Sequence, residues 1–396
     1  MPRNVVIAGS TGSIGSQALD VVRLYPDRYR VLALSANEKW PLLYEQCCAF
    51  NPDYVCVAND DAFKALSLAL SDRDVCVLSG RDFPRIISLP EVDVVLAAIT
   101  GTAGLVATCA ALESGKEVLL ANKESLVAGG PVIMDVARSS GANIIPIDSE
   151  HSALLQCLLP RDYSCETSAN LVKRLVLTAS GGPFWPLPFS QLDNVTPEQV
   201  CTHPRWSMGR KISVDSATMV NKGLEVAEAC WLFGVSPSKV GIVVHPESIV
   251  HGLVDYIDGV TLAHMSYPDM RTALSYALSS SNRHISGVSN IDLIKLGSLS
   301  FHALDTNIAP CLKIVLDAVT AGHSDCIIVN AANEAAVQLF LSGQIRFTDI
   351  LTIISETYSG VPARPCSTLD DILCFDQEVK AYASTVAKDR LSICVG

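Results

Sequence analysis

The sequence has few charged residues and a shortage of positive ones. Charged side chains make up 18% of the 396 residues and hydrophobic ones 49%, which excludes a largely disordered chain. The net charge of −12 argues against a nucleic-acid-binding surface, so we expect no nucleic-acid partner. An anionic ligand would therefore be held by local cations, backbone amides or a metal ion.

The sequence lacks any C-x-x-C pair, although it contains fourteen cysteines. These cysteines are scattered through apolar stretches, which favours buried free thiols over disulfides or a zinc site. Free thiols are typical of a reducing compartment, and we expect a cytoplasmic protein.

The sequence also lacks a clear membrane span. The longest uncharged run, Val94 to Leu112, carries Thr100, Gly101 and Thr102 in its middle, so it predicts a buried strand, a tight loop and a helix. The N-terminal residues enter a strand at once, which leaves no room for a signal peptide. We expect no membrane partner.

A glycine-rich segment, GSTGSIG, occupies residues 9–15 between a predicted strand and an amphipathic helix. Gly9, Gly12 and Gly15 would allow a tight turn, close approach to a pyrophosphate and helix–sheet contact. This context favours dinucleotide binding over a purely structural turn.

Apolar strands then alternate with helical patterns, which predicts an α/β fold with a parallel, doubly wound sheet. The predicted strands are residues 4–9, 29–34, 54–58, 75–78, 92–98 and 117–121. Polar residues follow two of them, at Thr100–Thr102 and at Asn122–Ser125. A Lys-Glu pair in a loop is usually a surface ion pair, but at a strand's carboxyl end it favours a role in a site.

The predicted strand over residues 142–147 is followed by Asp148 and Glu150. With Glu225 from a later helix, these carboxylates would form an oxygen-rich site for Mg²⁺ or Mn²⁺. The alternative for Asp148 is a simple N-cap of a helix over residues 153–159.

The segment from His203 to Trp231 predicts a proline-containing loop followed by a helix capped by Asp215 or Ser216. On that helix Asn221, Glu225 and Glu228 share one face, which suits a metal ion and a phosphate. The alternative is the solvated face of an amphipathic helix. The aromatic, proline-rich residues 184–210 favour a lid over a disordered loop.

The remaining segments predict a second α/β region and a helical end. A strand over residues 174–178 leads to Ser180-Gly181-Gly182, which is either a phosphate cradle or a turn. Further strands are predicted at residues 240–244 and 261–264, and a helix from about Pro268 to Leu278. Residues 282–304 are irregular, and residues 308–385 return to helical periodicity.

Seven motifs occur together in order: GSTGSIG, LLANKESLV, IPIDSEHSA, ASGGPF, HPRWSMGRKISVDSATMVNKGLE, PDMRT and NAANEAAV. On these motifs nearly the whole chain resembles the 1-deoxy-D-xylulose 5-phosphate reductoisomerase family. The resemblance implies an NADPH-binding Rossmann-like domain over residues 1–148 and a catalytic α/β domain with lid and dimer interface over residues 149–282. A linker over residues 283–306 and a C-terminal helical bundle over residues 307–396 would follow.

The resemblance also implies roles for individual residues. Metal ligands would be Asp148, Glu150 and Glu225. Substrate contacts would be Lys123, Ser149, Glu150, Ser180, His203, Ser216, Asn221, Lys222 and Glu225, with Ser180, Ser216, Asn221 and Lys222 on the phosphate. Cofactor contacts would be Thr11, Gly12, Ser13, Ile14, Asn37, Asn122, Glu124 and Gly209. Trp206 would be the indole of the lid, and Met208 would lie beside the nicotinamide.

The chemistry of the family gives these residues a purpose. A phosphorylated sugar substrate would rearrange by retro-aldol cleavage and re-aldolisation, with a divalent metal as Lewis acid, before NADPH reduces the resulting aldehyde. Lys123 and Glu150 are the candidates for proton transfer, and His203 and Trp206 would complete the catalytic set. The family also implies a homodimer.

Two positions depart from the family pattern, and two other function classes stay open. Trp185 stands where the family usually has arginine, and Glu38 interrupts a region that is often basic or neutral. Because the second strand ends in neutral residues, we expect Ser35, Asn37 and Lys39 to contact the 2′-phosphate of NADPH. The alternatives are another metal-assisted NAD(P)-dependent dehydrogenase of a sugar phosphate and a non-catalytic dinucleotide sensor.

Overall fold

The computed structural model describes residues 1–158, 171–202, 205–206, 208–280, 282–306 and 308–394. Two compact units divide the chain. The first comprises Met1–Ser125, Ile133–Asp148 and Asp269–Val288, and the second comprises Leu126–Val132, Ser149–Pro268 and Ser289–Gly396.

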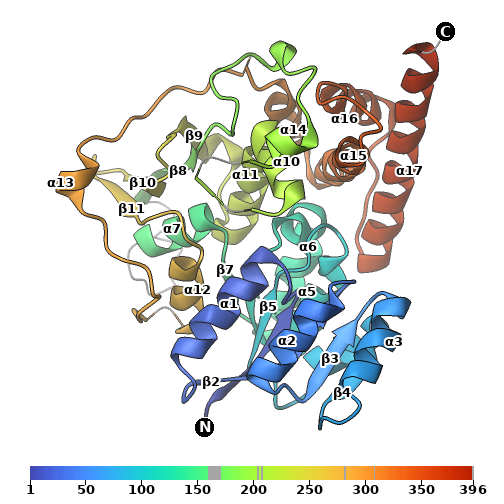
Figure 1. Ribbon diagram of the computed structural model, residues 1–396. Helices are drawn as coiled ribbons and strands as arrows, with labels where there is room; N and C mark the ends of the chain where they lie inside the picture. The colour runs from blue at the N-terminus through green and yellow to red at the C-terminus, as the bar shows by residue number, and fades with distance from the viewer. Residues whose placement is uncertain (159–170, 203–204, 207, 281, 307, 395–396) are drawn as a thin grey trace. The chain divides into compact units, whose positions relative to one another are not determined.

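The first unit contains a seven-stranded parallel sheet with helices between its strands (Figure 1). Its elements are β1 (Arg3–Ala8), α1 (Ser13–Leu24), β2 (Tyr29–Ala36), α2 (Trp40–Phe50), β3 (Tyr54–Val57), α3 (Asp60–Ala69), β4 (Cys76–Ser79), η1 (Gly80–Asp82), α4 (Phe83–Ile87), β5 (Val94–Ala97), α5 (Gly104–Glu113), β6 (Glu117–Leu120), α6 (Lys123–Ser140) apart from Leu126–Val132, β7 (Ile144–Pro146) and α12 (Arg271–Leu278). The strand order is β4-β3-β2-β1-β5-β6-β7, so the order reverses between β1 and β5. A ligand crevice is expected at the carboxyl ends of these two strands.

The prediction of an α/β fold with a doubly wound parallel sheet is confirmed. The strands are apolar because both faces of a parallel sheet are covered by helices, and β1 and β5 are buried along most of their length. The uncharged run from Val94 supplies β5, a loop and α5, as expected. Within the described part of the chain, no helix is long and apolar enough to cross a bilayer.

The second unit contains a four-stranded mixed sheet, in the order β11-β10-β8-β9, and a set of helices. Its elements are α7 (Ser149–Cys157), β8 (Val172–Ala179), η2 (Phe189–Gln191), α9 (Pro197–Val200), α10 (Arg210–Ala217), α11 (Val220–Phe233), η3 (Pro237–Lys239), β9 (Val240–Val244), β10 (Val250–Tyr256), β11 (Thr261–Met265), α13 (Leu293–Leu296), α14 (Pro310–Ala321), α15 (His323–Leu341), α16 (Asp349–Gly360) and α17 (Leu369–Cys394).

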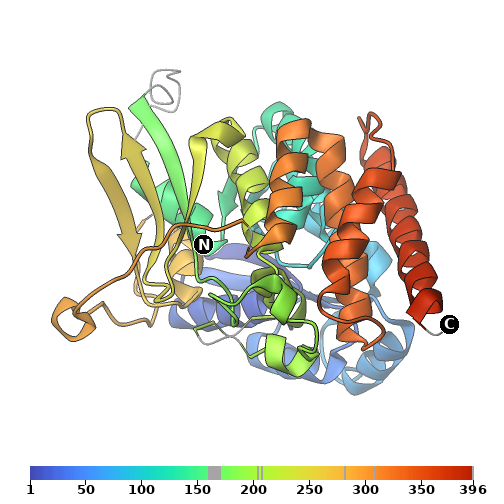
Figure 2. The same cartoon turned by 90° about the horizontal axis from the view of Figure 1, so that it is seen from above.

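Helix α11 lies between this sheet and the C-terminal helices (Figure 2). Its residues Val226 and Leu224 belong to two apolar clusters, one shared with β8 and one shared with α14 and α15. On a third side, the Trp231 indole packs against Gly130 of α6. A Cβ on Gly130 would lie 2.3 Å from the indole. A helix buried on several faces explains why the functional side chains of α11 are not on a solvated surface.

Two local predictions were wrong, and one strand was missed. Strand β10 was not predicted, although it pairs with both β8 and β11. The helix after β7 begins at Ser149 and not at Ala153, so Glu150 lies in its first turn. The central helix is two helices, α10 and α11, separated by Met219 in the left-handed region at φ 62°. Asp215 and Ser216 therefore end α10 and do not cap α11.

Candidate functional site

The glycine-rich turn between β1 and α1 has the geometry of a dinucleotide-binding loop. Gly9 has a φ of 86°, and a Cβ on Gly15 would lie 2.4 Å from the Gly9 carbonyl oxygen. Gly12 precedes α1 without a side-chain cap. The first turn of α1 can therefore present its backbone amides to a pyrophosphate, close to the backbone and at the positive end of the helix dipole.

The end of β2 divides its polar residues between structure and surface. The Ser35 hydroxyl is buried and accepts a hydrogen bond from the Gly9 amide at 3.0 Å, so it fixes the glycine loop. Asn37, Glu38 and Lys39 are exposed, and Lys39 is the residue before α2. The 2′-phosphate contact predicted for Ser35 thus conflicts with its burial, whereas Asn37 and Lys39 are available to a ligand.

Asn122 joins the loops at the ends of β5 and β6. Its Oδ1 accepts a hydrogen bond from the Ser125 amide at 3.0 Å and caps α6. Its Nδ2 donates to the Gly101 carbonyl at 2.8 Å. Asn122 is buried, so it shapes the crevice at the carboxyl ends of the strands. Lys123 and Glu124 are also buried, which excludes the alternative of a surface ion pair.

A group of carboxylates surrounds the start of α7. The Lys123 ammonium forms an ion pair with Asp148, the residue directly before Ser149. The Ser149 hydroxyl donates to the Glu150 carboxylate. One oxygen atom each from Asp148, Glu150 and Glu225 lies within 4.8 Å of the others, so the three predicted metal ligands converge.

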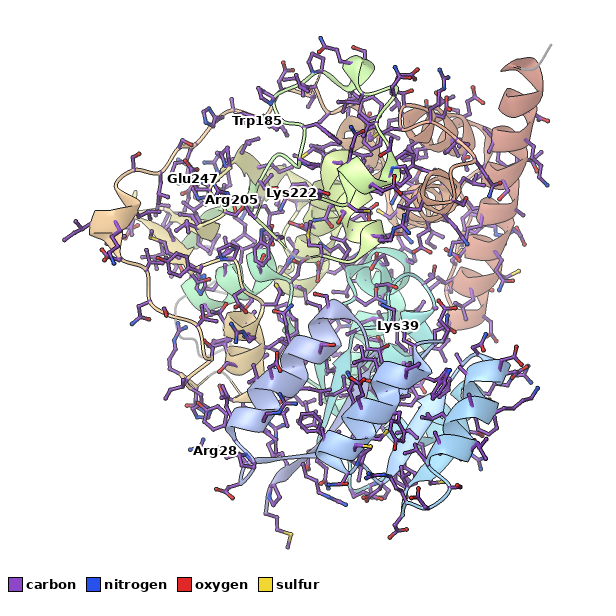
Figure 3. The ribbon with its side chains drawn as sticks, viewed as in Figure 1. Arg28, Lys39, Trp185, Arg205, Lys222 and Glu247 are labelled. Carbon is purple, nitrogen blue, oxygen red and sulfur yellow. The ribbon has the colours of Figure 1, made fainter. Side chains whose placement is uncertain are left out.

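Lys222 of α11, which is labelled in Figure 3, contacts two of these carboxylates. Its Nζ is 2.6 Å from Glu150 Oε1 and 2.5 Å from Glu225 Oε2, and the Asn221 amide donates to Glu225 Oε1 at 2.6 Å. Burial lowers the pKa of Lys222, but the charges and hydrogen bonds of Glu150 and Glu225 outweigh this effect and raise the pKa above its usual value. Lys222 is therefore a buried cation that balances two carboxylates.

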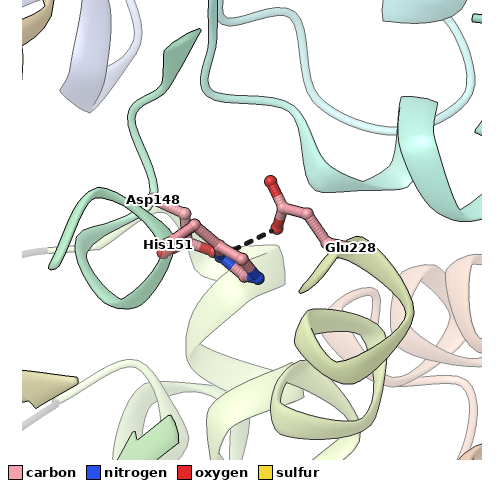
Figure 4. Close-up of side chains that lie close together, drawn as sticks. All are labelled: Asp148, His151 and Glu228. Atoms are coloured by element: carbon pink, nitrogen blue, oxygen red, sulfur yellow. Dashed lines mark ion pairs between the residues drawn. The ribbon is translucent and has the colours of Figure 1, made fainter. Parts of the chain in front are cut away.

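His151 and Glu228 form a second buried pair beside Glu225. His151 Nδ1 lies 3.2 Å from Glu228 Oε2 (Figure 4), and Nε2 of the same ring lies 2.9 Å from the Glu225 carbonyl oxygen. Both side chains are fully buried. The alternative that Glu225 and Glu228 lie on a solvated helix face is therefore wrong. Sequence spacing placed Glu228 on the face of Glu225, but nothing local linked it to His151.

The Ser180-Gly181-Gly182 segment packs against the end of α10. Gly182 has a φ of 75°, and a Cβ there would lie 2.8 Å from the Ser216 carbonyl oxygen. The Gly182 amide donates to the Ser180 hydroxyl at 3.2 Å. The structure thus packs Gly182, two residues after Ser180, against Ser216; both serines are predicted phosphate contacts.

The predicted lid is described in part. His203 lies outside the described residues. The Trp206 indole contacts the His251 ring edge-to-face at a centroid distance of 5.7 Å, and His251 Nε2 lies 3.1 Å from the Ser266 carbonyl oxygen. Burial lowers the pKa of His251, with the Glu150 charge acting in the opposite direction, so the neutral ring is favoured. His251 lies on β10, the strand that was not predicted, so its aromatic contact with Trp206 was not predicted either.

Trp185 packs against Gly181, and Met208 and Gly209 lie directly before α10. The Trp185 ring lies 4.8 Å from that of His302, and a Cβ on Gly181 would lie 2.6 Å from the Trp185 Cβ. Met208 is half-buried, and Gly209 is the exposed residue before α10.

A glycine loop at the sheet's switch point and a group of half-buried and buried carboxylates with their lysine define a dinucleotide-dependent enzyme with an acidic catalytic centre. Models of the 1-deoxy-D-xylulose 5-phosphate reductoisomerase family match residues 5–130, and models of C-terminal domains of this enzyme match residues 144–233 and 265–382. The chain belongs to the 1-deoxy-D-xylulose 5-phosphate reductoisomerase family.

Relatives of that name share much of the sequence. The enzyme of Pseudomonas putida KT2440 is 47% identical over 382 residues, covering 96% of this chain and 95% of its own. The enzyme of Nitrosococcus oceani is 47% identical over 390 residues, with 98% of both chains covered.

Solved structures of reductoisomerases also align with nearly the whole chain. A DOX-P reductoisomerase crystallised with NADPH, fosmidomycin and magnesium aligns with a TM-score of 0.92 at 41% identity, covering 98% of each chain. The Zymomonas mobilis enzyme in complex with NADPH aligns with a TM-score of 0.88 at 38% identity, covering 98% of this chain and 99% of that one.

Proposed function

We propose that this protein converts 1-deoxy-D-xylulose 5-phosphate into 2-C-methyl-D-erythritol 4-phosphate, by rearrangement of the carbon skeleton followed by hydride reduction with NADPH. The observation that carries the proposal is the convergence of Asp148, Glu150 and Glu225 beside Lys222. A non-catalytic dinucleotide sensor has no need of three converging carboxylates.

The cofactor is NADPH, held at the glycine loop of the first unit. Gly9 and Gly15 leave no room for a side chain, which suits the close approach of a pyrophosphate to the backbone. The proposed contacts are Thr11, Gly12, Ser13, Ile14, Asn37, Asn122 and Glu124. From their sequence motif, Gly209 is proposed as a further cofactor contact and Met208 as the neighbour of the nicotinamide.

The donor set of Asp148, Glu150 and Glu225 fits a divalent metal, because Mg²⁺ and Mn²⁺ prefer hard carboxylate oxygens. When bound, the metal supplies Lewis-acid polarisation of the substrate's ketone and hydroxyl oxygens. Asn221 and Ser149 orient two of the ligands, since they donate to the carboxylates of Glu225 and Glu150.

The substrate's phosphate is held by Ser180, Ser216, Asn221 and Lys222. The Gly182 backbone, two residues after Ser180, packs against the Ser216 carbonyl at the end of α10, which supports a shared role for the two serines. Lys222 lies on the next helix, α11, and is buried. Because water screens its charge only weakly there, its ammonium group can attract a phosphate strongly. In the structure the Lys222 ammonium contacts the carboxylates, and its long side chain lets it serve either anion.

Proton transfer falls to Lys123 and Glu150, and Trp206 excludes water. Lys123 is a buried ammonium paired with Asp148, and Glu150 accepts a hydrogen bond from the Ser149 hydroxyl at the start of α7. The Trp206 indole, held against His251, covers the bound sugar, and His203 completes the substrate contacts.

The protein acts as a homodimer in the cytoplasm. Strand β11 is the edge of its sheet, with Thr261, Ala263 and Met265 exposed on one face. Ile294 of α13 is 94% exposed. An edge strand and, separately, a strongly exposed apolar side chain support association with a second copy. Most of the described cysteines are buried or half-buried thiols, which suits a reducing compartment.

The test is an assay of purified protein with 1-deoxy-D-xylulose 5-phosphate, NADPH and Mg²⁺ or Mn²⁺, followed by nicotinamide absorbance. We expect absorbance to fall only when all components are present. Product formation without skeletal rearrangement would favour a sugar-phosphate dehydrogenase. NADPH binding without turnover of any sugar phosphate would favour a dinucleotide sensor.

A further inference from the structure

A buried contact links the C-terminal helices to the end of α10. Asn333, on α15, donates from Nδ2 to Asp215 Oδ1 at 2.8 Å across 118 residues of sequence. The relative exposure is 0% for Asn333 and 1% for Asp215. Lys211, one turn earlier on α10, forms an ion pair with the other Asp215 oxygen at 2.7 Å.

The position of Asp215 is unfavourable for a carboxylate in isolation. It lies in the last turn of α10, where the helix dipole disfavours negative charge, and it is removed from water. A buried charge is tolerated when hydrogen bonds and opposite charges surround it, which is what Asn333 and Lys211 provide. An apolar residue would fill the same space without these requirements, so the carboxylate points to a need for a fixed orientation.

The orientation that Asp215 fixes is that of the proposed phosphate cradle. Ser216 is the next residue, and its carbonyl oxygen is in contact with the Gly182 backbone. The Asp215 carbonyl oxygen accepts a hydrogen bond from the Thr218 hydroxyl at 3.2 Å, and this hydroxyl in turn accepts from the Val220 amide at the start of α11. A shift of Asp215 would therefore displace both Ser216 and the start of α11, which carries the proposed phosphate contacts Asn221 and Lys222.

We propose that Asn333 is a positioning residue for phosphate binding, acting through Asp215 on Ser216 and on the start of α11. This proposal rests on the proposed function, because it concerns the same phosphate site. It gives the C-terminal helices, which carry no predicted substrate contact, a part in substrate affinity.

The test is Asn333→Asp, which keeps the shape of the side chain but sets a second carboxylate against Asp215. We expect KM for the sugar phosphate to rise about tenfold or more, because a small displacement of binding groups is costly. We expect kcat to change less than KM, and KM for NADPH to stay within about twofold. Binding of inorganic phosphate, measured by calorimetry, should weaken in parallel.

Asn330→Asp is the matched control. Asn330 lies on the same helix and is equally buried, but its amide donates to Glu334 of its own helix at 3.2 Å. Asp215→Asn combined with Asn333→Asp restores a donor–acceptor pair and should recover part of the phosphate affinity. If Asn333→Asp does not fold, Asn333→Ser, which shortens the side chain, is measured in its place.

Two results would overturn the proposal. One is a variant with reduced melting temperature but unchanged phosphate binding and unchanged KM, which indicates a purely structural contact. The other is an equal effect of Asn330→Asp. Because phosphate binding is measured without turnover, a wild-type protein that binds phosphate but does not convert the sugar would contradict the proposed function alone.

Discussion

Buried charge is the feature that sets the chemistry of individual residues in this protein. Glu225 and Glu228 are fully buried, and Lys222 is 3% exposed. Removing one member of such a group leaves the others uncompensated in a medium that screens charge poorly. Conservative substitutions should therefore have large and distinguishable effects.

Glu225→Gln should abolish turnover and weaken metal binding by at least about tenfold, because the substitution removes an anionic oxygen from the proposed ligand set. NADPH binding should persist, because Glu225 is not part of the glycine loop that holds the cofactor. Titration of Mn²⁺ by calorimetry measures the effect. Glu228→Gln, one turn further along α11 and equally buried, is the comparison, and equal metal affinity in wild type and Glu225→Gln would contradict the assignment.

Lys39→Ala should raise KM for NADPH by about tenfold or more, the loss expected for one charge-assisted hydrogen bond, and leave KM for NADH nearly unchanged. Lys39 and Glu38 are both exposed at the end of β2, so neither substitution should affect folding. Glu38→Ala is the control and should leave the preference for NADPH intact. A higher kcat/KM with NADH in the wild type would mean that Glu38 binds the ribose hydroxyls instead.

Trp206→Ala should lower kcat/KM by about tenfold or more, because the substrate loses its aromatic cover and water gains access. Metal and NADPH affinities should not change. Steady-state kinetics beside calorimetry separates the two effects. Trp206→Phe keeps a ring against His251 and should recover much of the activity, and an alanine variant with normal kinetics would exclude a lid role.

At the scale of elements, the break between α10 and α11 is what assembles the phosphate cradle. Met219 takes a left-handed conformation between the two helices, at some conformational cost for a non-glycine residue. A continuous helix would carry Ser216 away from Gly182. The periodicity of the sequence did not reveal the break, because the apolar spacing of Val220, Leu224 and Trp231 continues through α11 alone.

Helix α15 begins at His323, and protonation of this histidine should make the free energy of unfolding depend on pH. Burial lowers the pKa of His323 from its usual 6.5, with an opposing influence from its contact with the Ala128 carbonyl oxygen at 2.7 Å. Below pH 6.5 the unfolded chain takes up a proton that the folded chain does not, so stability falls as pH falls.

Thermal unfolding between pH 7.5 and pH 5.5 should therefore show a loss of stability to which His323 contributes at most about 1.4 kcal/mol per pH unit. His323→Gln should reduce this slope. Some slope should persist, because the pKa of His251 is lowered in the same direction. An identical slope in wild type and variant would show that His323 does not titrate differently in the two states.

At the scale of the whole molecule, the proposed dimer makes a separate prediction. Ile294→Asp together with Ala263→Pro should yield a monomer, because the first places charge in an exposed apolar patch and the second interrupts the edge strand β11. Sedimentation velocity measures the change. Leu68→Asp alters a leucine that is 78% exposed on α3 and should have no effect, and a dimeric double variant would exclude this surface.

The sequence by itself determined the parts that depend on local pattern. Strand β1, the glycines and α1 follow from period and backbone freedom within about twenty residues, and Asp148 and Glu150 lie close together because only Ser149 separates them in the chain. The tertiary structure decided which distant groups meet: His151 with Glu228, Trp206 with His251, and Asn333 with Asp215. Burial turned the carboxylates of α11 from an apparent polar face into an enclosed site. Such contacts arise from the packing of several elements against one another, and no periodicity within a single element records them.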